Sequence, residues 1–285
     1  VGALQLGMRN THDGLDVRTI LKAAAEGKIE CLIVVGADPL SDFADASLAR
    51  RGIEGARRLI VVDSFLSATA QQASVVLPAS MWAEKSGTTT NIEGRVTTVA
   101  QQVNPAGTAR ADWMIAAEIA LELGTDLGYD SVDAITADIA AKVPAYAALA
   151  DGIGPDGVVT AVPTTMAPLP KPSPTIAERN SYDFRLVVSR TLYDQAASTL
   201  QSPSLLPLVE SAAIHVHPLD LDRVGAGEGA SVRVSNSRGS TVMKVATDPT
   251  VLRGTAWVPF NRPGTGVGEL IDCFADVNDV RIENL

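Results

Sequence analysis

Three short apolar runs restrict the first half of this 285-residue chain more than any other feature. They span Cys31 to Val35, Leu59 to Val62 and Val75 to Leu77, and each stops at a glycine, aspartate or proline. Short runs rich in β-branched residues predict strands that are covered on both faces, as in a parallel α/β sheet. We therefore expect a βαβαβ order with right-handed crossovers, in which the residues of the first run are core residues.

Helical spacing of apolar residues fills the intervals between these runs. The segment after Asp16 predicts a helix that Gly27 ends, and the segment after Ala111 predicts a helix that Gly124 ends. Further helices are expected at Ser41 to Arg50, Ser67 to Ala73, and Ser131 to Leu149 with an interruption at Pro144.

The chain changes character after residue 150. Residues 151–181 hold six of the 16 prolines, which predicts a stiff, extended linker. Residues 182–285 contain short β-rich runs split by turns, which predicts a compact barrel or sandwich. We expect an α/β domain at 1–150, the linker at 151–181 and the β domain at 182–285.

Composition excludes several classes of function. With a net charge of −10 and no basic face, the chain is not expected to bind nucleic acid or anionic membrane. No apolar run approaches the ~20 residues of a membrane span. The two cysteines are too few for an ordinary iron–sulfur cluster, and Cys31 is expected to be a buried, inert thiol. Few cysteines favour a reducing compartment, and a chain that begins with Val1 suggests a piece of a longer protein.

Polar residues follow the predicted strands, where α/β sheets bind ligands. Asp63 and Ser64 end one strand, and a glycine-punctuated loop carries Asn91, Glu93 and Arg95. For each candidate a structural role is as well supported as a ligand contact. Asp63 can cap a helix, and the loop residues can hold their own turn.

Two further candidates are weaker. The turn Gly36-Ala37-Asp38-Pro39 lacks the G-x-G-x-x-G spacing of a dinucleotide loop. A plain turn at the end of a strand explains it as well as a ligand-binding rim does. His215 and His217 share one face of a predicted strand, but without a nearby third ligand a structural role is favoured over a metal site.

Several motifs in fixed order resemble the signature of the molybdopterin oxidoreductase superfamily. These motifs are Asp63-Ser64-Phe65, Ala73 to Ala79, Glu84 to Thr88 and Glu93-Gly94-Arg95. The turn at Gly36 to Pro39 resembles the G-x-N-P rim that precedes these motifs in the superfamily, with Asp38 in place of asparagine. Val187 to Asp194 and Asp248 to Pro263 resemble the C-terminal double-psi-type barrel of that superfamily. The resemblance implies an α/β fold in which a parallel-sheet domain is followed by this barrel.

The resemblance also implies a cofactor rim, whose pterin-nucleotide positions here are Gly36, Asp38, Asp63, Ser64, Asn91, Arg95 and Arg190. Two departures argue that the rim is vestigial. Gly268 stands where molybdenum enzymes tend to have asparagine, and Ile271 where they have threonine. Unpaired polar atoms of a buried cofactor would cost about 1 to 3 kcal/mol each. We expect no cofactor in this portion, and no metal ligand or catalytic residue.

Within the superfamily, three segments resemble the large iron–sulfur subunits of respiratory NADH:quinone oxidoreductase (complex I). They are the helix from Ala111, the run Ser189 to Asp194 and the ending Asp279 to Glu283. Complex I passes electrons from NADH to quinone and translocates protons. This resemblance implies a cluster-free scaffold of the peripheral arm, with iron–sulfur clusters in a missing N-terminal part. It implies other peripheral-arm subunits as partners and a cytoplasmic location at the face of the inner membrane, without membrane insertion.

Two alternatives stay open. The first is a molybdopterin-dependent oxidoreductase of the formate-dehydrogenase or nitrate-reductase type, in which Asp63, Asn91 and Arg95 would grip the cofactor. The second is a nucleotide-binding regulatory module with its site near Asp63.

Overall fold

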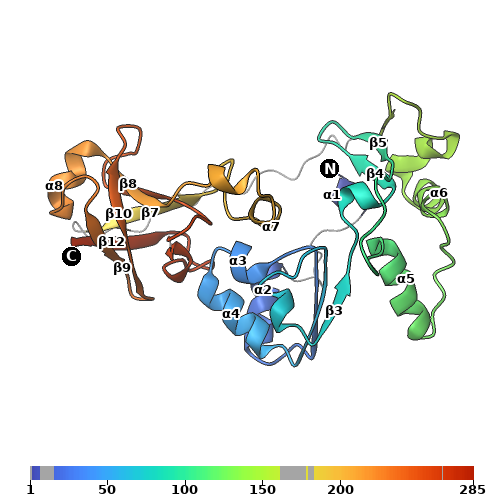
Figure 1. Cartoon of the computed structure of the whole chain (residues 1–285), viewed down its shortest axis with the longest axis horizontal. Helices are drawn as coiled ribbons and strands as arrows, with labels where there is room; N and C mark the ends of the chain where they lie inside the picture. The colour runs from blue at the N-terminus through green and yellow to red at the C-terminus, as the bar shows by residue number, and fades with distance from the viewer. Residues whose placement is uncertain (1, 7–15, 161–177, 179–182, 265) are drawn as a thin grey trace. The chain divides into compact units, whose positions relative to one another are not determined.

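The computed structural model describes residues 2–6, 16–160, 178, 183–264 and 266–285. The chain divides into two compact units, each assembled from separate segments. The first comprises residues 1–16, 61–64 and 75–172, and the second comprises residues 17–60, 65–74 and 173–285. Figure 1 shows the chain, with labels on many of its helices and strands. Among the described residues, no helix is both long and apolar enough to cross a bilayer.

The three predicted strands are present and form one sheet in the order β1-β2-β3. Their bounds are Cys31–Val35 for β1, Arg58–Asp63 for β2 and Val75–Pro78 for β3. The predicted first helix, α2 (Val17–Ala25), is followed by Gly27 at a φ of +69°. This helix lies close against α4 (Ala46–Gly55), since a Cβ added at Gly55 would lie 2.3 Å from the Ala24 carbonyl oxygen.

Two predicted helices are wrong in their extent. In place of one helix at Ser41 to Arg50, the chain forms α3 (Pro39–Asp42) and then α4. The break arises because the Asp45 side chain accepts a hydrogen bond from the Leu48 N–H at 2.9 Å and starts a new helix there. Ser67 to Ala73 contains only the 3₁₀ turn η1 (Ala70–Gln72), whose Ala70 N–H is bound by the Ser67 hydroxyl instead.

The prediction that the strands are covered on both faces is wrong for β1 and β3. In β1, Leu32 and Val34 are buried, whereas Ile33 and Val35 are 52% and 56% exposed. Cys31 is exposed as well, so the prediction that this cysteine is buried is also wrong. No residue of β3 is fully buried. Since side chains alternate between the faces of a strand, one apolar face of β1 is open.

The polar loop expected after β3 contains a β-hairpin. β4 (Gly87–Thr90) pairs antiparallel with β5 (Arg95–Val99), and β5 pairs antiparallel with β6 (Val158–Val159). The threonine run in β4 is a signal for a strand, because β-branched residues favour that conformation. Val96 of β5 is fully buried in a small core with Ala140, Tyr146 and Leu149.

The remaining elements of the first unit follow the predicted helices. α5 (Asp112–Glu122) is followed by Gly124 at a φ of +86°, and Ile115 of this helix packs with Val62 and Ala79. α6 (Val132–Lys142) gives way to the 3₁₀ segment η3 (Pro144–Asp151), which confirms the interruption at Pro144. Two short elements, α1 (Gly2–Gln5) and η2 (Trp82–Glu84), complete this unit.

The β-rich last part of the chain forms a closed barrel with the strand order β10-β8-β11-β7-β12-β9. Two strand pairs in the barrel, β10 with β8 and β11 with β7, are parallel, and the others are antiparallel. The strands are β7 (Phe184–Ser189), β8 (Ala213–Val216), β9 (Ser231–Ser235), β10 (Ser240–Thr247), β11 (Thr255–Pro259) and β12 (Asn278–Asn284). The short helical segments are α7 (Ala197–Leu200), η4 (Leu206–Leu208), η5 (Pro218–Asp220), α8 (Leu221–Val224) and η6 (Val267–Glu269).

The barrel encloses a hydrophobic core of its own. Its strands alternate cleanly, so that Phe184, Ile214, Val232 and Val258 are fully buried inside it. The predicted fold class, a parallel-sheet α/β region followed by a β-barrel, is confirmed.

The proline-rich segment falls mostly outside the description. Residues 151–160 are described and include β6. Residues 161–177 and 179–182 lie outside the described residues, and most of the predicted linker at 151–181 falls there.

Candidate functional site

Asp38 lies in the turn after β1 and is used inside the fold. One carboxylate oxygen accepts hydrogen bonds from the Thr69 N–H (3.0 Å) and the Thr69 hydroxyl (2.5 Å). The other accepts from the Ser41 hydroxyl (2.7 Å) and the Ala68 N–H (3.2 Å). Burial would raise the pKa of Asp38, but the hydrogen bonds, led by the Thr69 hydroxyl, hold it below its usual value. The turn itself needs Gly36, whose φ is +57°.

Asp63 and Ser64 lie where a strand end is predicted. Asp63 is the last residue of β2, and its carbonyl oxygen accepts a hydrogen bond from the Ala79 N–H at 3.0 Å. Its side chain is partly buried, and Ser64 is exposed.

Asn91 and Arg95 hold the turn between β4 and β5. The Asn91 side-chain oxygen accepts hydrogen bonds from the Glu93 and Arg95 N–H groups, both at 2.9 Å. The Arg95 guanidinium donates to the Asp156 carbonyl at 2.8 Å. These contacts form the loop clamp that the sequence leaves open as an alternative. Asn91, Arg95, Asp63 and Ser64 lie in the first unit, and the other predicted rim residues lie in the second.

Arg190, just after β7, is the centre of a polar cluster in the second unit. Its Nε donates to Asp194 at 2.7 Å, and its Nη2 donates to Asp42, in α3, at 3.1 Å. The same Asp42 oxygen accepts from the Asn261 side-chain amide at 2.7 Å. Burial raises the pKa of Asp42 despite Arg190, and the nearby Asp194 and Asp38 carboxylates add to that rise.

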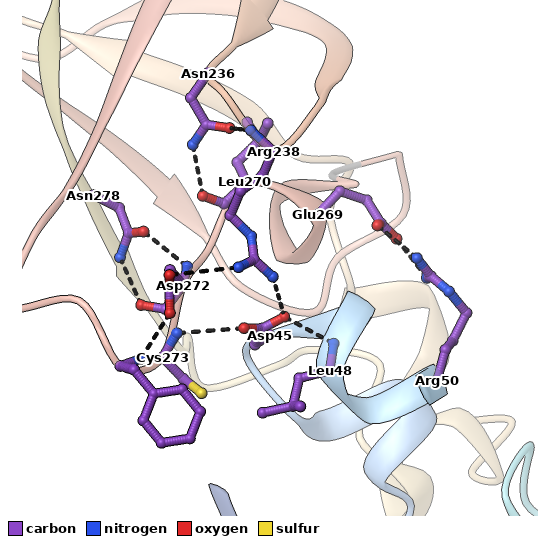
Figure 2. A network of polar contacts seen from close by, with 11 residues as sticks. Asp45, Leu48, Arg50, Asn236, Arg238, Glu269, Leu270, Asp272, Cys273 and Asn278 are labelled. Atoms are coloured by element: carbon purple, nitrogen blue, oxygen red, sulfur yellow. Dashed lines mark hydrogen bonds and ion pairs between the residues drawn. The ribbon is translucent and has the colours of Figure 1, made fainter. Parts of the chain in front are cut away.

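A second cluster joins α4 to the barrel, as Figure 2 shows. Asp45 is 2% exposed and accepts from Arg238 at 2.7 Å, in addition to capping α4. Arg238 also approaches Asp272 at 3.5 Å. Beside them, Arg50 of α4 donates two hydrogen bonds to Glu269, at 2.5 and 2.7 Å.

Of these residues the sequence singles out only Arg190 as part of the rim. Asp42 and Asp45 follow the predicted turn at Gly36 to Pro39, which is the one local signal for them. Their arginine partners lie 148 and 193 residues further along the chain, so no local pattern pairs them.

Cavities in the second unit adjoin these clusters. One of about 400 Å³ is lined by Asp42, Arg190, Ser189 and Phe260, together with apolar barrel residues. Another of about 170 Å³ lies beside Asn261 and Gly268. A Cβ added at Gly268 would lie 3.0 Å from the Ala46 Cβ, so barrel and α4 are in direct contact there.

The two clusters do not fit an anionic dinucleotide. Three guanidinium groups face five carboxylates, which leaves two uncompensated negative charges. The guanidinium groups belong to Arg50, Arg190 and Arg238, and the carboxylates to Asp42, Asp45, Asp194, Glu269 and Asp272. A diphosphate would add negative charge to a region that is already negative. Ile271, one of the two departures from the family pattern, is 8% exposed and belongs to the barrel core.

The two histidines of the predicted strand have separate environments. The His215 ring lies 4.7 Å from the Trp257 ring, and His217 Nδ1 accepts a hydrogen bond from the Leu219 N–H at 3.1 Å. Within the described ranges, no three His, Cys, Asp or Glu side chains group as metal ligands.

Two family models match the chain. Residues 2–122 match molybdopterin oxidoreductase, and residues 184–280 match the molydopterin dinucleotide binding domain. The second match points toward molybdopterin binding, whereas the sequence-based expectation is no cofactor.

Curated relatives carry different activities in their names. The chain is 32% identical to the NADPH-Fe(3+) oxidoreductase subunit alpha of Geobacter sulfurreducens over 95% of its length and 32% of that protein. It is 32% identical to an NADH-quinone oxidoreductase subunit of Rhizobium meliloti, in a match that covers 87% of this chain and 29% of that protein. It is 26% identical to the F420-dependent formate dehydrogenase 1 subunit alpha of Methanococcus maripaludis, in a match that covers 93% of this chain and 43% of that protein. The chain thus spans less than half the length of each of these relatives.

A solved structure shares the fold. Acetylene hydratase from Pelobacter acetylenicus matches 94% of this chain and 46% of its own, with a TM-score of 0.64 and 18% identity.

Proposed function

Because the chain belongs to the molybdopterin oxidoreductase family, we propose that it is a cluster-free scaffold portion of the large iron–sulfur subunit of an NADH:quinone oxidoreductase (complex I). In this role it holds neighbouring subunits of the peripheral arm and performs no chemistry of its own. Electron transfer from NADH through iron–sulfur clusters to quinone, with proton translocation, takes place elsewhere in the assembly.

One observation carries this proposal: the polar groups of the second unit that could receive a dinucleotide bind one another. Arg190 is shared by Asp42 and Asp194, and Arg238 is bound to the buried Asp45. Charged groups that are paired in this way hold two elements together, and they would have to separate before an anionic cofactor could enter. The relative that is named as an NADH-quinone oxidoreductase subunit supports the choice of complex.

The partners and location follow from this proposal. The chain contacts other peripheral-arm subunits and lies at the cytoplasmic face of the inner membrane. The test is purification of the native assembly through an affinity tag on this chain, followed by metal and pterin analysis. We expect NADH:quinone oxidoreductase subunits, iron, and neither molybdenum nor tungsten. One molybdenum or tungsten atom and one pterin dinucleotide per chain would contradict the scaffold role.

A second function is favoured by a specific observation, the match of residues 184–280 to a dinucleotide binding domain. It is a molybdopterin-dependent oxidoreductase of the formate-dehydrogenase or nitrate-reductase type, a class that includes the formate dehydrogenase relative. Here the predicted rim would hold the dinucleotide, and the molybdenum would supply the redox chemistry. The residues of this rim are Gly36, Asp38, Asp63, Ser64, Asn91, Arg95 and Arg190. Substitution of Arg190 by glutamine would then lower cofactor content, whereas the scaffold role predicts no change.

A further inference from the structure

The Arg190 cluster has the features of an anion site that already contains an anion. We propose that the Asp42 carboxylate substitutes for a phosphate-type anion: it fills a site formed by the Arg190 guanidinium and the Asn261 amide and keeps that site closed. This inference rests on the proposed function, in which no dinucleotide is bound, and it names the group that excludes one.

Two donors from different barrel segments converge on one Asp42 oxygen. The Arg190 Nη2 lies 3.1 Å from it and the Asn261 Nδ2 lies 2.7 Å from it. Guanidinium and amide donors on a single oxygen are what a phosphate oxygen would also receive. Asp42 comes from α3, so the anion is supplied by one part of the second unit and the donors by another.

The backbone at Asn261 is held in an unfavourable conformation. Among the described residues it is the one non-glycine residue with a positive φ, at +54°. Its carbonyl oxygen accepts a hydrogen bond from the Gln195 N–H at 2.7 Å, which holds this loop in place. Strained positions of this kind persist where the surrounding structure fixes them and are concentrated at ligand sites.

Space for a ligand lies next to the cluster. The cavity of about 400 Å³ has both Asp42 and Arg190 in its lining, with Phe260 beside them. Its volume is within the roughly 300 to 1,000 Å³ that small-molecule sites have. Arg190 lies over the Phe260 ring, with its Cζ 5.9 Å from the centroid, which holds the guanidinium at the cavity wall.

Asp42 is the surplus carboxylate of the cluster. Arg190 is bound through its Nε by the buried Asp194, and that hydrogen bond is the largest cause of the raised pKa of Arg190. Burial raises the pKa of Asp42, which means that the ionised carboxylate is less stable in the folded protein than in water, and Arg190 offsets only part of that cost. A variant that lacks this carboxylate is therefore expected to fold, with the Arg190 Nη2 and the Asn261 amide left without their acceptor.

The experiment is calorimetric titration of the purified chain with inorganic pyrophosphate and, separately, with ADP. The variants are Asp42→Ala, Asp42→Ala with Arg190→Gln, and Glu228→Ala, which removes one exposed negative charge outside the cluster. We expect Asp42→Ala to bind pyrophosphate at least tenfold more tightly than wild type and Glu228→Ala. The double variant should lose this gain. The titration with ADP tests whether a nucleoside diphosphate binds at the Arg190 cluster as pyrophosphate does.

The outcomes separate the two proposals. If folded Asp42→Ala binds pyrophosphate no better than Glu228→Ala, Asp42 is not an anion substitute, and the scaffold role is untouched. If wild type already binds pyrophosphate or ADP tightly through Arg190, the site is open and both proposals fail. Circular dichroism reports folding, and Asp42→Asn provides the same test should the alanine variant not fold.

Discussion

The barrel and the β1-β2-β3 sheet use the same kinds of aliphatic residue but bury them differently. In the barrel most inward strand residues are buried, because a closed sheet has an inside with no edge. In β1 the two faces differ, with Val34 buried and Ile33 more than half exposed. A closed barrel therefore completes its own core, whereas an open sheet needs a cover for each face.

Phe184→Ala should have the largest effect. Phe184 is fully buried in the barrel, and its ring lies 4.4 Å from the Arg223 Cζ. We expect a loss of about 3 to 5 kcal/mol in the free energy of unfolding, measured in urea. The control is Phe274→Ala, because Phe274 is 49% exposed and contacts Arg18 and Lys22 at the surface instead of filling the barrel core. Equal losses in the two variants would mean that the barrel does not have a sealed core.

Asp38→Ala should have the next largest effect, although Asp38 belongs to the turn of the open sheet. Its removal leaves the Thr69 N–H and the Ala68 N–H without their acceptor. We expect a loss of about 2 to 3 kcal/mol in urea denaturation. Asp38→Asn, which keeps one acceptor oxygen, should lose less. A loss below about 0.5 kcal/mol for the alanine variant would show that the turn does not depend on this carboxylate.

The adjacent pair Val34→Thr and Ile33→Thr compares the two faces of β1 directly. Each change places a hydroxyl group on a β-branched side chain, so the strand propensity is kept. Val34→Thr should cost about 1 to 2 kcal/mol, because its hydroxyl is buried. Ile33→Thr should change stability by less than about 0.5 kcal/mol. Similar losses, measured by thermal unfolding, would mean that the outer face is covered after all.

The smallest expected effect is a difference in pH dependence between Asp38 and Asp42. The lowered pKa of Asp38 means that its contribution to stability is present above its ordinary pKa and is lost as pH falls through the lowered value. The raised pKa of Asp42 means the opposite: its contribution is present below its ordinary pKa and is lost as pH rises through the raised value. Relative to wild type, Asp42→Asn should therefore gain stability as pH rises from the ordinary pKa of aspartate through the raised value, and Asp38→Asn should lose the acid-dependent change where Asp38 titrates. Urea denaturation across this range checks both signs.

Much of the fold can be predicted from local patterns. The strands at Cys31 to Val35 and Phe184 to Val188 follow from short apolar runs, and the helix ends at Gly27 and Gly124 follow from glycine at positive φ. These signals depend only on neighbouring residues. The break in the expected helix at Ser41 to Arg50 does not follow from apolar periodicity, because it depends on the side-chain hydrogen bond with which Asp45 caps α4.

The candidate site can be predicted only in part. The sequence singles out the turn at Gly36 to Pro39 and Arg190, and it offers a loop clamp as one role for Asn91 and Arg95. It does not identify Asp42, Asp194 and Asn261, since nothing in their neighbours marks them as partners of Arg190.

Local patterns in the sequence predict most of the elements and their order, and they limit the C-terminal part to a barrel or a sandwich, because backbone conformation and apolar periodicity are set by residues close together in the chain. Which face of β1 is open, and which carboxylates Arg190 binds, depend on the folded structure. Burial depends on the whole packed surface, and the Asp42 and Arg190 side chains, 148 residues apart in the chain, meet only once both segments have folded.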